Sequence, residues 1–353
     1  MADEAGGKAG ALRKLAIAAA VGAALLVGLH LLRPLAHVLL LAFAGLLFSV
    51  FLDAAASAIV RRTRLPRGAA VAIVVLCVFA VPALVGVVAG PGIAEQLTAL
   101  FRTLPDTWNG VRTWLQGTRW GPGILAWLPD VRQTFNLESA TVHGIAAFFT
   151  TVFQGFVGAF VILFIGIYVS LAPAFYVDGA LKLVPSARRA RYRRVAWSIV
   201  RALRRWLIGR MVAMAVVGAL VTLGLWIADV PYPLALGLIA ALLEFVPYVG
   251  PVAAAVPGIL VALSASPVTA LYALVVFIAV QAAENYVVSP LVEHRAVSLG
   301  PAVLVVAQVL MGVLFGGLGV LLATPFTVVV VIAIQMLYVE DVLGDRTRVL
   351  GEC

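Results

Sequence analysis

The stretch ALLEFVPYVGPVAAAVPG, residues 241–258, lies within an apolar run that is otherwise long enough to cross a membrane. It carries one carboxylate, Glu244, and Gly250 permits a tight turn. Three prolines interrupt helical hydrogen bonding here, namely Pro247, Pro251 and Pro257. Unpaired backbone at membrane depth is tolerated only where protein buries it or water reaches it. The stretch therefore predicts a broken membrane span beside a polar cavity.

The composition of the whole chain agrees with a membrane protein. Of its 353 residues, 63% are hydrophobic and 12% are charged, and the mean hydropathy is +1.09. Soluble domains carry roughly 25% charged residues. We therefore expect an all-α integral membrane protein. The formal net charge of +9 is concentrated beside apolar runs, so membrane topology explains it and we expect no nucleic-acid partner.

Apolar runs of about 20 residues, the length that crosses a hydrocarbon core of ~30 Å, recur along the chain. They predict about eight transmembrane helices, at 15–32, 35–52, 69–90, 144–173, 207–228, 233–263, 268–291 and 301–338. The sixth and eighth runs are too long for one simple crossing, and both contain glycine and proline. We expect each to be a broken helix or a re-entrant hairpin, interrupted at 245–258 and at 315–325.

The charges of the connecting segments predict the orientation. Residues 61–67 contain four arginines and no acid, and residues 178–210 contain ten basic residues against one acid. Residues 91–142 balance four arginines with four acids. Because basic loops stay in the cytoplasm, we expect 91–142 to face outward and both termini to face the cytoplasm.

This orientation divides the chain into six parts. They are an N-terminal hairpin with a third span (1–90), extracytoplasmic helices (91–142), a fourth span (143–175), a basic cytoplasmic amphipathic helix (176–208), a C-terminal transport core (209–338) and a cytoplasmic tail (339–353). The four tryptophans of 91–142 favour the headgroup level of the membrane, where we expect short helices at the outer surface.

Two features concern partners. Apolar residues recur at three- and four-residue steps through 188–210, with arginines on the other side. This pattern predicts a helix lying in the inner headgroup layer and binding anionic lipid, although the arginines can instead serve only as topology determinants.

In the fourth span, Gly155, Gly158 and Gly166 permit close helix contact, either within one subunit or between the subunits of a homo-oligomer.

Enzyme motifs are missing from the sequence. It contains no phosphate-binding loop, dinucleotide fingerprint, nucleophile elbow or H-E-x-x-H pair. The four histidines, at positions 30, 37, 143 and 294, are scattered, and none pairs with another at metal-ligand spacing. We therefore expect no enzyme, no metal site and no cofactor.

A small set of polar residues lies within the apolar runs. Glu244 lies ~17 Å along its span by helical rise, close to mid-membrane, and Glu284 lies ~24 Å along the next, nearer the outer surface. Gln281 and Asn285 accompany Glu284. Carboxylates within a membrane usually face a cavity and mark ion or substrate paths. Since no lysine or arginine lies within thirty residues of Glu244, we expect it to lack a local partner and to exchange protons.

The remaining polar residues of the spans receive simpler interpretations. Arg210 and Asp53 stand at predicted span ends, where we expect them only to snorkel or to pair. Gln308 and Gln335 are expected to form hydrogen bonds between helices.

Three blocks of the C-terminal half carry a family resemblance. They are EFVPYVGPVAAAVPG (244–258), AAENYVVSPLVEHRAVSLGPAVLV (282–305) and GVLFGGLGVLLATPFTVVV (312–330). In order and spacing they resemble the autoinducer-2 exporter family, the PerM-like permeases. The resemblance implies a multi-pass protein of the bacterial inner membrane that exports small molecules. It assigns helix-break or gating positions to Pro247, Gly250, Pro251, Pro257, Pro290, Pro301, Gly316, Gly319 and Pro325, and pathway positions to Glu244, Glu284 and Asn285.

These features predict a secondary transporter that exports a small polar or amphiphilic metabolite resembling autoinducer-2, with ion coupling. A sodium/proton antiporter that uses Glu244 and Glu284 is the alternative within transport. A membrane scaffold or regulator that transports nothing is the alternative from another class.

The orientation can be tested by labelling. In a Cys77→Ser, Cys353→Ser background, single cysteines at Arg64 and Arg119 should react with an impermeant thiol reagent from opposite sides of the membrane. In intact cells only the cysteine at position 119 should label. Equal labelling of both positions would contradict the predicted orientation.

Overall fold

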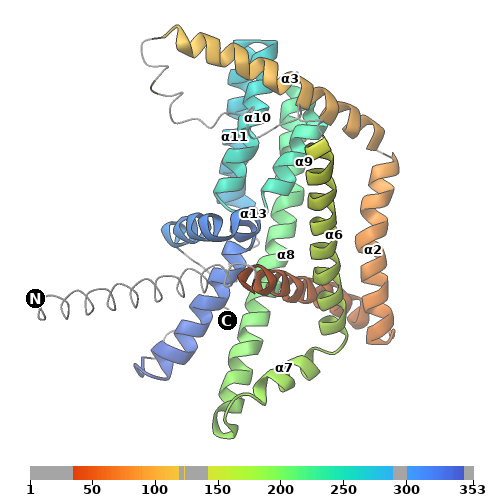
Figure 1. Cartoon of the computed structure of the whole chain (residues 1–353), viewed down its shortest axis with the longest axis vertical. Helices are drawn as coiled ribbons and strands as arrows, with labels where there is room; N and C mark the ends of the chain where they lie inside the picture. Colours follow the sequence, from red (N-terminus) through yellow and green to blue (C-terminus); the bar gives the residue numbers. More distant parts are fainter. Residues whose placement is uncertain (1–34, 89, 119–122, 124–141, 289–299, 346–353) are drawn as a thin grey trace, which may run out of the picture.

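The computed structural model describes residues 35–88, 90–118, 123, 142–288 and 300–345. This part of the chain is helical and contains no strand (Figure 1), which confirms the all-α membrane fold. The helices are Leu35–Arg62, α2 (Arg67–Val88), α3 (Gly90–Gln116), α6 (Val142–Leu171), α7 (Pro173–Leu181), α8 (Arg189–Ile227), α9 (Pro233–Leu243), α10 (Val249–Ala265), α11 (Pro267–Ala283) and α13 (Pro301–Ile334). A 3-10 turn, Ser186–Arg188, precedes α8, and π-helical segments, Glu284–Val288 and Gln335–Glu340, follow α11 and α13.

Helix α8 is the longest element and runs along the length of the molecule (Figure 1). Its 39 residues correspond to ~58 Å, about twice the thickness of a hydrocarbon core. The sequence predicted a separate surface helix at 188–210 and a span starting at 207. In the structure the two are one continuous helix, so no break separates the arginine-rich part from the apolar part. The location of the arginine-rich part in the headgroup layer stays a prediction.

The two ends of α8 lie in different surroundings. Helix α3 crosses the molecule at one end, and α7 with the basic start of α8 lies at the other (Figure 1). Helix α3, Gly90–Gln116, is one amphipathic helix of 27 residues that covers the first part of 91–142, where short helices were expected. Leu100 of α3 is fully buried, and Gln96 accepts a hydrogen bond from the backbone N–H of Ala235 at 3.2 Å. Helix α3 therefore anchors the start of α9.

The described residues account for five or six of the expected eight spans. Among the described residues, five helices are long and apolar enough to cross a membrane. A sixth crossing results if α6 and α7, bent by 92° at Ala172, count as one broken span. The predicted sixth span consists of α9 and α10, with 11 and 17 residues, and α9 is too short to cross alone. The predicted span 15–32 lies outside the described residues.

Helices α9 and α10 form the first hairpin of the C-terminal half. They are joined by the turn 244–248, in which Tyr248 has a positive φ of 64°. A Cβ atom on Gly250 would lie 1.9 Å from the carbonyl oxygen of Leu243, so this close approach requires glycine. The start of α9 and the end of α10 share a buried cluster with Leu100 of α3. The pair therefore leaves α3, turns at 244–248 and returns, as a re-entrant hairpin does.

Helix α13 contains the second break, at Gly316. This residue has φ 66° and ψ −148°, a conformation essentially restricted to glycine. A Cβ on Gly319 would lie 2.0 Å from the carbonyl oxygen of Met311, and one on Gly312 would lie 2.8 Å from Val320. Residues eight positions apart in a continuous helix are separated by ~12 Å. The two arms of α13, on either side of Gly316, therefore fold back toward each other, as expected for a broken segment.

The N-terminal helices pack through small residues. Cβ atoms on Gly45 of the helix Leu35–Arg62 and on Gly166 of α6 would lie 2.7 Å from Ile165 and 2.4 Å from Phe48. Gly166 thus allows close helix contact within one chain. This is one of the two interpretations given above for the glycines of the fourth span. Asp53 pairs with Arg67 of α2, whose guanidinium also donates to the carbonyl of Ser170 on α6. These contacts tie three helices together.

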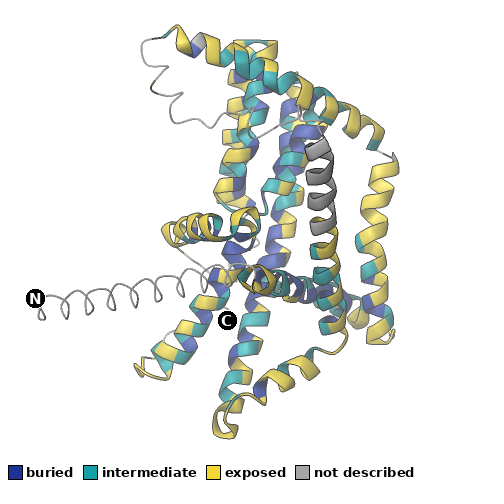
Figure 2. Ribbon diagram, viewed as in Figure 1, coloured by how far each residue is buried: buried dark blue, intermediate teal, exposed yellow. Residues whose placement is uncertain are grey.

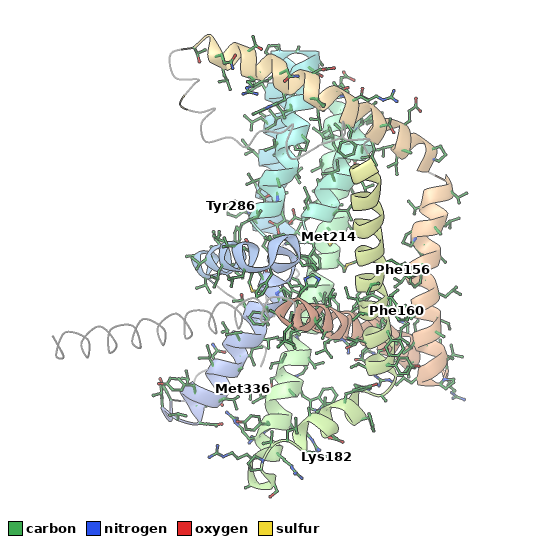
Figure 3. The ribbon with its side chains drawn as sticks, viewed as in Figure 1. Phe156, Phe160, Lys182, Met214, Tyr286 and Met336 are labelled. Atoms are coloured by element: carbon green, nitrogen blue, oxygen red, sulfur yellow. The ribbon has the colours of Figure 1, made fainter. Side chains whose placement is uncertain are left out.

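Buried residues gather along α8 and the helices beside it, whereas α2 is largely exposed (Figure 2). On α6, Phe156 and Phe160 are exposed (Figure 3), and with Phe164 and Tyr168 they form an aromatic row at four-residue steps. Exposed apolar helices of this kind suit a lipid environment.

At the basic end of α8, Arg191 lies 2.6 Å from Glu340 and 3.0 Å from Asp341. These ion pairs connect α8 to the end of the last helix.

The break in α13 can be tested with two neighbouring glycines. Gly316→Ala should lower the free energy of unfolding by about 1–3 kcal/mol, because its φ/ψ disfavours a Cβ atom. Gly317→Ala should leave stability unchanged or raise it, because Gly317 is helical with open space around its Cα. Thermal unfolding of both variants in detergent measures the difference. Equal melting temperatures for the two variants would argue against the break.

Candidate transport site at the helix breaks

Glu244 occupies the first position of the turn 244–248, directly after α9. Its side chain is 2% exposed, and its carboxylate accepts a hydrogen bond at 2.8 Å from the guanidinium of Arg210, which is 3% exposed. Arg210 Nε also donates to the backbone carbonyl of Phe245 at 3.3 Å. The guanidinium thus binds both a side chain and the opened backbone of the turn.

The expectation that Glu244 lacks a local partner is wrong. Arg210 lies 34 residues upstream of Glu244 in the sequence, so the absence of a cation within thirty residues did not exclude it as a partner. The sequence also assigned Arg210 to the end of a span that started at 207. Because the basic helix and the span form one helix, Arg210 instead lies near the middle of α8. The sequence contained one indication of this. Arg210 lies three residues inside an apolar run, and no proline separates that run from the basic helix before it.

A second carboxylate approaches the same guanidinium. Glu284 Oε1 lies 3.7 Å from Arg210 Nη1, and Gln281 donates to Glu284 Oε2 at 3.0 Å. Glu284 begins the π-helical segment Glu284–Val288, where the regular hydrogen bonding of α11 ends. It is buried, as Glu244 is. The structure therefore brings together Glu244, Glu284 and Gln281 around Arg210.

One guanidinium in this cluster faces two carboxylates, and Glu244 and Glu284 also make further contacts. Charges buried in a dry interior are costly unless they are paired and hydrogen-bonded. The way in which the two carboxylates share Arg210 therefore depends on whether each of them is ionised.

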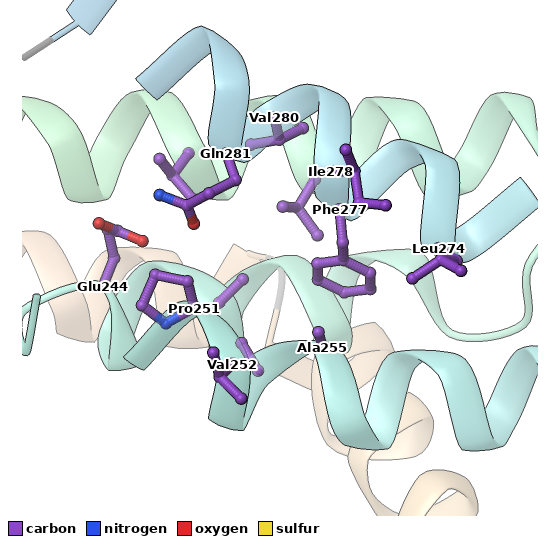
Figure 4. Close-up of a pocket in the computed structure, with 13 residues that line it drawn as sticks. Glu244, Pro251, Val252, Ala255, Leu274, Phe277, Ile278, Val280 and Gln281 are labelled. Atoms are coloured by element: carbon purple, nitrogen blue, oxygen red, sulfur yellow. The ribbon is translucent and has the colours of Figure 1, made fainter. Parts of the chain in front are cut away.

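A cavity of about 190 Å³ opens beside Glu244 between α8, α9, α10 and α11 (Figure 4). Glu244 and Gln281 supply its polar end. The other walls are mostly apolar and include Pro251, Val252, Leu274, Phe277 and Ile278. A cavity with one polar end and apolar walls fits a small amphiphilic molecule.

The predicted break residues occupy distinct places. Pro247 lies in the turn 244–248, and its carbonyl accepts a hydrogen bond from Gln308 of α13 at 2.8 Å, so Gln308 links helices as expected. Gly250 packs against Leu243, and Pro251 lines the cavity. Gly316 forms the break in α13.

The other predicted positions lie away from the cluster or inside helices. Asn285 is exposed on the π-helical segment, so the structure does not bring it to Arg210. Pro257 and Pro325 lie inside α10 and α13, and Pro301 is the first residue of α13. Gly319 lies at the close contact between the arms of α13. Pro290 is outside the described residues. The gating role assigned to these residues stays a prediction.

An all-helical membrane protein with broken helices, buried charges at the breaks and a cavity beside them belongs to the class of membrane transporters. Comparison with known proteins gives the particular family. The model of the AI-2E family transporters matches residues 15–338, so the chain belongs to this family. The resemblance seen in the three sequence blocks is thereby confirmed.

Relatives in several bacteria have names that assign them to transport and give no substrate. YueF of Bacillus subtilis (strain 168) is 25% identical over 307 residues, which cover 81% of this chain and 80% of YueF. YrrI of the same organism is 27% identical over 245 residues, or 68% of this chain and 69% of YrrI. MT0215 of Mycobacterium tuberculosis (strain CDC 1551 / Oshkosh) is 35% identical over 132 residues, or 36% of this chain and 35% of MT0215.

The sharing of Arg210 by two carboxylates predicts how the cluster responds to mutation. Arg210→Gln leaves two buried carboxylates without their cation and should cost about 3–5 kcal/mol of stability. Adding Glu244→Gln to Arg210→Gln should restore part of that loss, because one of the two charges is removed. Arg193→Gln is a matched control, since Arg193 pairs with Asp178 at a site where both side chains are more than half exposed. Its cost should stay below about 1 kcal/mol. Similar losses in Arg210→Gln and Arg193→Gln, measured by thermal unfolding, would contradict the buried cluster.

Proposed function

We propose that this transporter is an ion-coupled secondary exporter of small amphiphilic metabolites, of which autoinducer-2 is the leading candidate. The observation that carries the proposal is the double role of Glu244, which lines the cavity and also binds Arg210. A substrate in the cavity and a proton on the carboxylates therefore act on the same residue. Such sharing is what coupling between a solute and an ion requires.

The coupling follows from the single guanidinium. When one carboxylate is protonated, Arg210 pairs with the other. When the proton leaves, both carboxylates compete for Arg210, which changes the polar end that Glu244 presents to the cavity. A ligand shifts such an equilibrium by its difference in affinity for the two states. Proton release and substrate movement are thus linked through Arg210.

The orientation of the chain in the membrane is inferred from its charges, and the kind of membrane is inferred from the relatives. The basic start of α8 and the balanced helix α3 lie at opposite ends of the molecule, which supports a cytoplasmic basic end. The arginines of that end suit contact with anionic lipid. YueF and YrrI come from a bacterium, which supports a place in the bacterial cytoplasmic membrane.

Sodium/proton antiport is the second candidate function. The two carboxylates at one guanidinium support it, because a carboxylate can bind sodium as well as a proton. The apolar walls of the cavity favour an organic solute over this alternative.

Flux measurements in proteoliposomes test the proposal. Glu244→Gln and Glu284→Gln should each fold, because either change leaves Arg210 with one carboxylate partner. Both should abolish the dependence of autoinducer-2 flux, or of sodium flux, on an imposed proton gradient. Glu95→Gln, on the exposed side of α3, is the control and should transport as the wild type does. If Glu244→Gln keeps the wild-type rate and pH dependence, Glu244 is not the coupling residue. Wild-type flux of sodium without autoinducer-2 flux would favour the antiporter.

A further inference from the structure

The cavity beside Glu244 has a buried polar end and an exposed apolar rim. Glu244 is buried at the polar end, whereas Val252 of α10 and Ile278 of α11 line the same cavity and are 67% and 61% exposed. Glu244 and Gln281 lie at one end of the cavity, and Leu274 lies at the other (Figure 4). The cavity therefore opens sideways, between α10 and α11.

This opening lies at the level of the hydrocarbon layer. Ile278 is midway along Pro267–Val288, one of the segments long and apolar enough to cross a membrane. Helix α11 carries no charged side chain, and Leu271 and Val275, which are also exposed on it, are apolar. An apolar face at this depth meets lipid chains, because the hydrocarbon core holds no water. A molecule that reaches the opening from outside the protein therefore comes from the lipid.

The polar end of the cavity offers mainly hydrogen-bond acceptors. The amide nitrogen of Gln281 donates to Glu284 at 3.0 Å, and the amide oxygen of Gln281 is an acceptor. Glu244 is the other polar residue that lines the cavity, and an ionised carboxylate accepts several hydrogen bonds and donates none. A ligand head that donates a hydrogen bond, such as a hydroxyl or an amine, is complementary to this end. A head that carries acceptors alone is not.

The apolar part of the cavity is elongated. Leu274, Phe277 and Gln281 line it at three- and four-residue steps, so they share one face of α11. From Leu274 to Gln281 the helix rises by ~10 Å. A Cβ atom on Gly258 would lie 2.5 Å from the ring of Phe277, so this glycine lets the ring pack closely against α10. The cavity thus presents a continuous apolar wall beside its polar end, which suits a single alkyl chain.

We propose that the cavity takes single-chain amphiphiles whose head donates a hydrogen bond, and that they enter it from the hydrocarbon layer between α10 and α11. The head binds at Glu244 and Gln281, and the chain lies along Phe277 toward Leu274. The inference rests on the proposed function in one respect, namely that this cavity holds the substrate. It adds the class of head group and the route of entry.

Photolabelling of the purified full-length protein in lipid nanodiscs tests the head group. The probes are a diazirine-bearing octan-1-ol and its methyl ether, which differ in the hydroxyl proton that donates the hydrogen bond. Mass spectrometry should locate adducts of the alcohol on the residues of α10 and α11 that line the cavity. The methyl ether should label these residues about tenfold less, the effect of one hydrogen bond to a charged group. Adducts on the largely exposed helix α2 give the non-specific level for each probe.

Two pairs of variants test the opening. Ile278→Trp and Val252→Trp each place a large side chain at the rim and should reduce the cavity adducts of the alcohol severalfold. Val275→Trp on α11 and Val256→Trp on α10 are the matched controls, because both residues are more than half exposed and neither lines the cavity. The controls should label as the wild type does. Should one rim variant not fold, the pair on the other helix is judged by the same criterion.

The proposal is overturned if the alcohol and its methyl ether label the cavity equally, if the alcohol labels the cavity no more than α2, or if the rim variants label as their controls do. These outcomes are separable from the flux test of Glu244→Gln. Selective labelling with unchanged flux in Glu244→Gln would leave the binding of amphiphiles standing and remove the coupling. Uncoupled flux in Glu244→Gln without selective labelling would do the reverse.

Discussion

The guanidinium of Arg210, buried near the middle of α8, is the constraint on which the C-terminal half depends. A positive charge at this depth must be neutralised, and neither neighbouring turn of α8 offers a carboxylate. The neutralising groups come instead from the turn after α9 and from the end of α11. Both helices stop where they meet Arg210. The breaks bring the carboxylates to the charge, and the charge in turn holds the opened backbone, as the bond to the Phe245 carbonyl shows.

The hairpin of α9 and α10 and the hairpin of α13 contact each other at the turn 244–248. Gln308 of α13 binds the carbonyl of Pro247, and Phe245 of the turn packs edge-on against Trp206 of α8, with ring centroids 5.5 Å apart. The turn 244–248 therefore touches α8 and α13 and carries the acid that faces the cavity. The cavity, the charge cluster and the second hairpin therefore meet at this one turn.

The sequence predicted the all-α membrane fold and the two broken segments, because proline and glycine in an apolar run conflict with a plain span and this conflict is local. It also singled out Glu244, Glu284 and Gln281, which the structure brings together at Arg210. Their role in a transport pathway stays a prediction. Arg210 as the partner of Glu244 was missed, because pairing across 34 residues is decided by tertiary packing. The count of eight spans is not confirmed, because the predicted first span lies outside the described residues and the predicted sixth consists of two short helices. Composition does not distinguish one long crossing from two short helices, such as α9 and α10, that turn back midway. The role of each break residue rests on the resemblance and stays a prediction.

Because α8 is unbroken, a rotation at Arg210 would move its basic end through a larger distance than its middle. Arg210 lies 21 residues from the start of the helix, a distance of ~32 Å along its axis. A rigid rod that pivots by about 10° at Arg210 displaces its basic end by about 5–6 Å, given that rise per residue. Arg191 ties this end to Glu340 and Asp341 at the end of the last helix. A small repositioning of one charged group inside the membrane is thereby converted into a displacement of a whole helix end at the far surface.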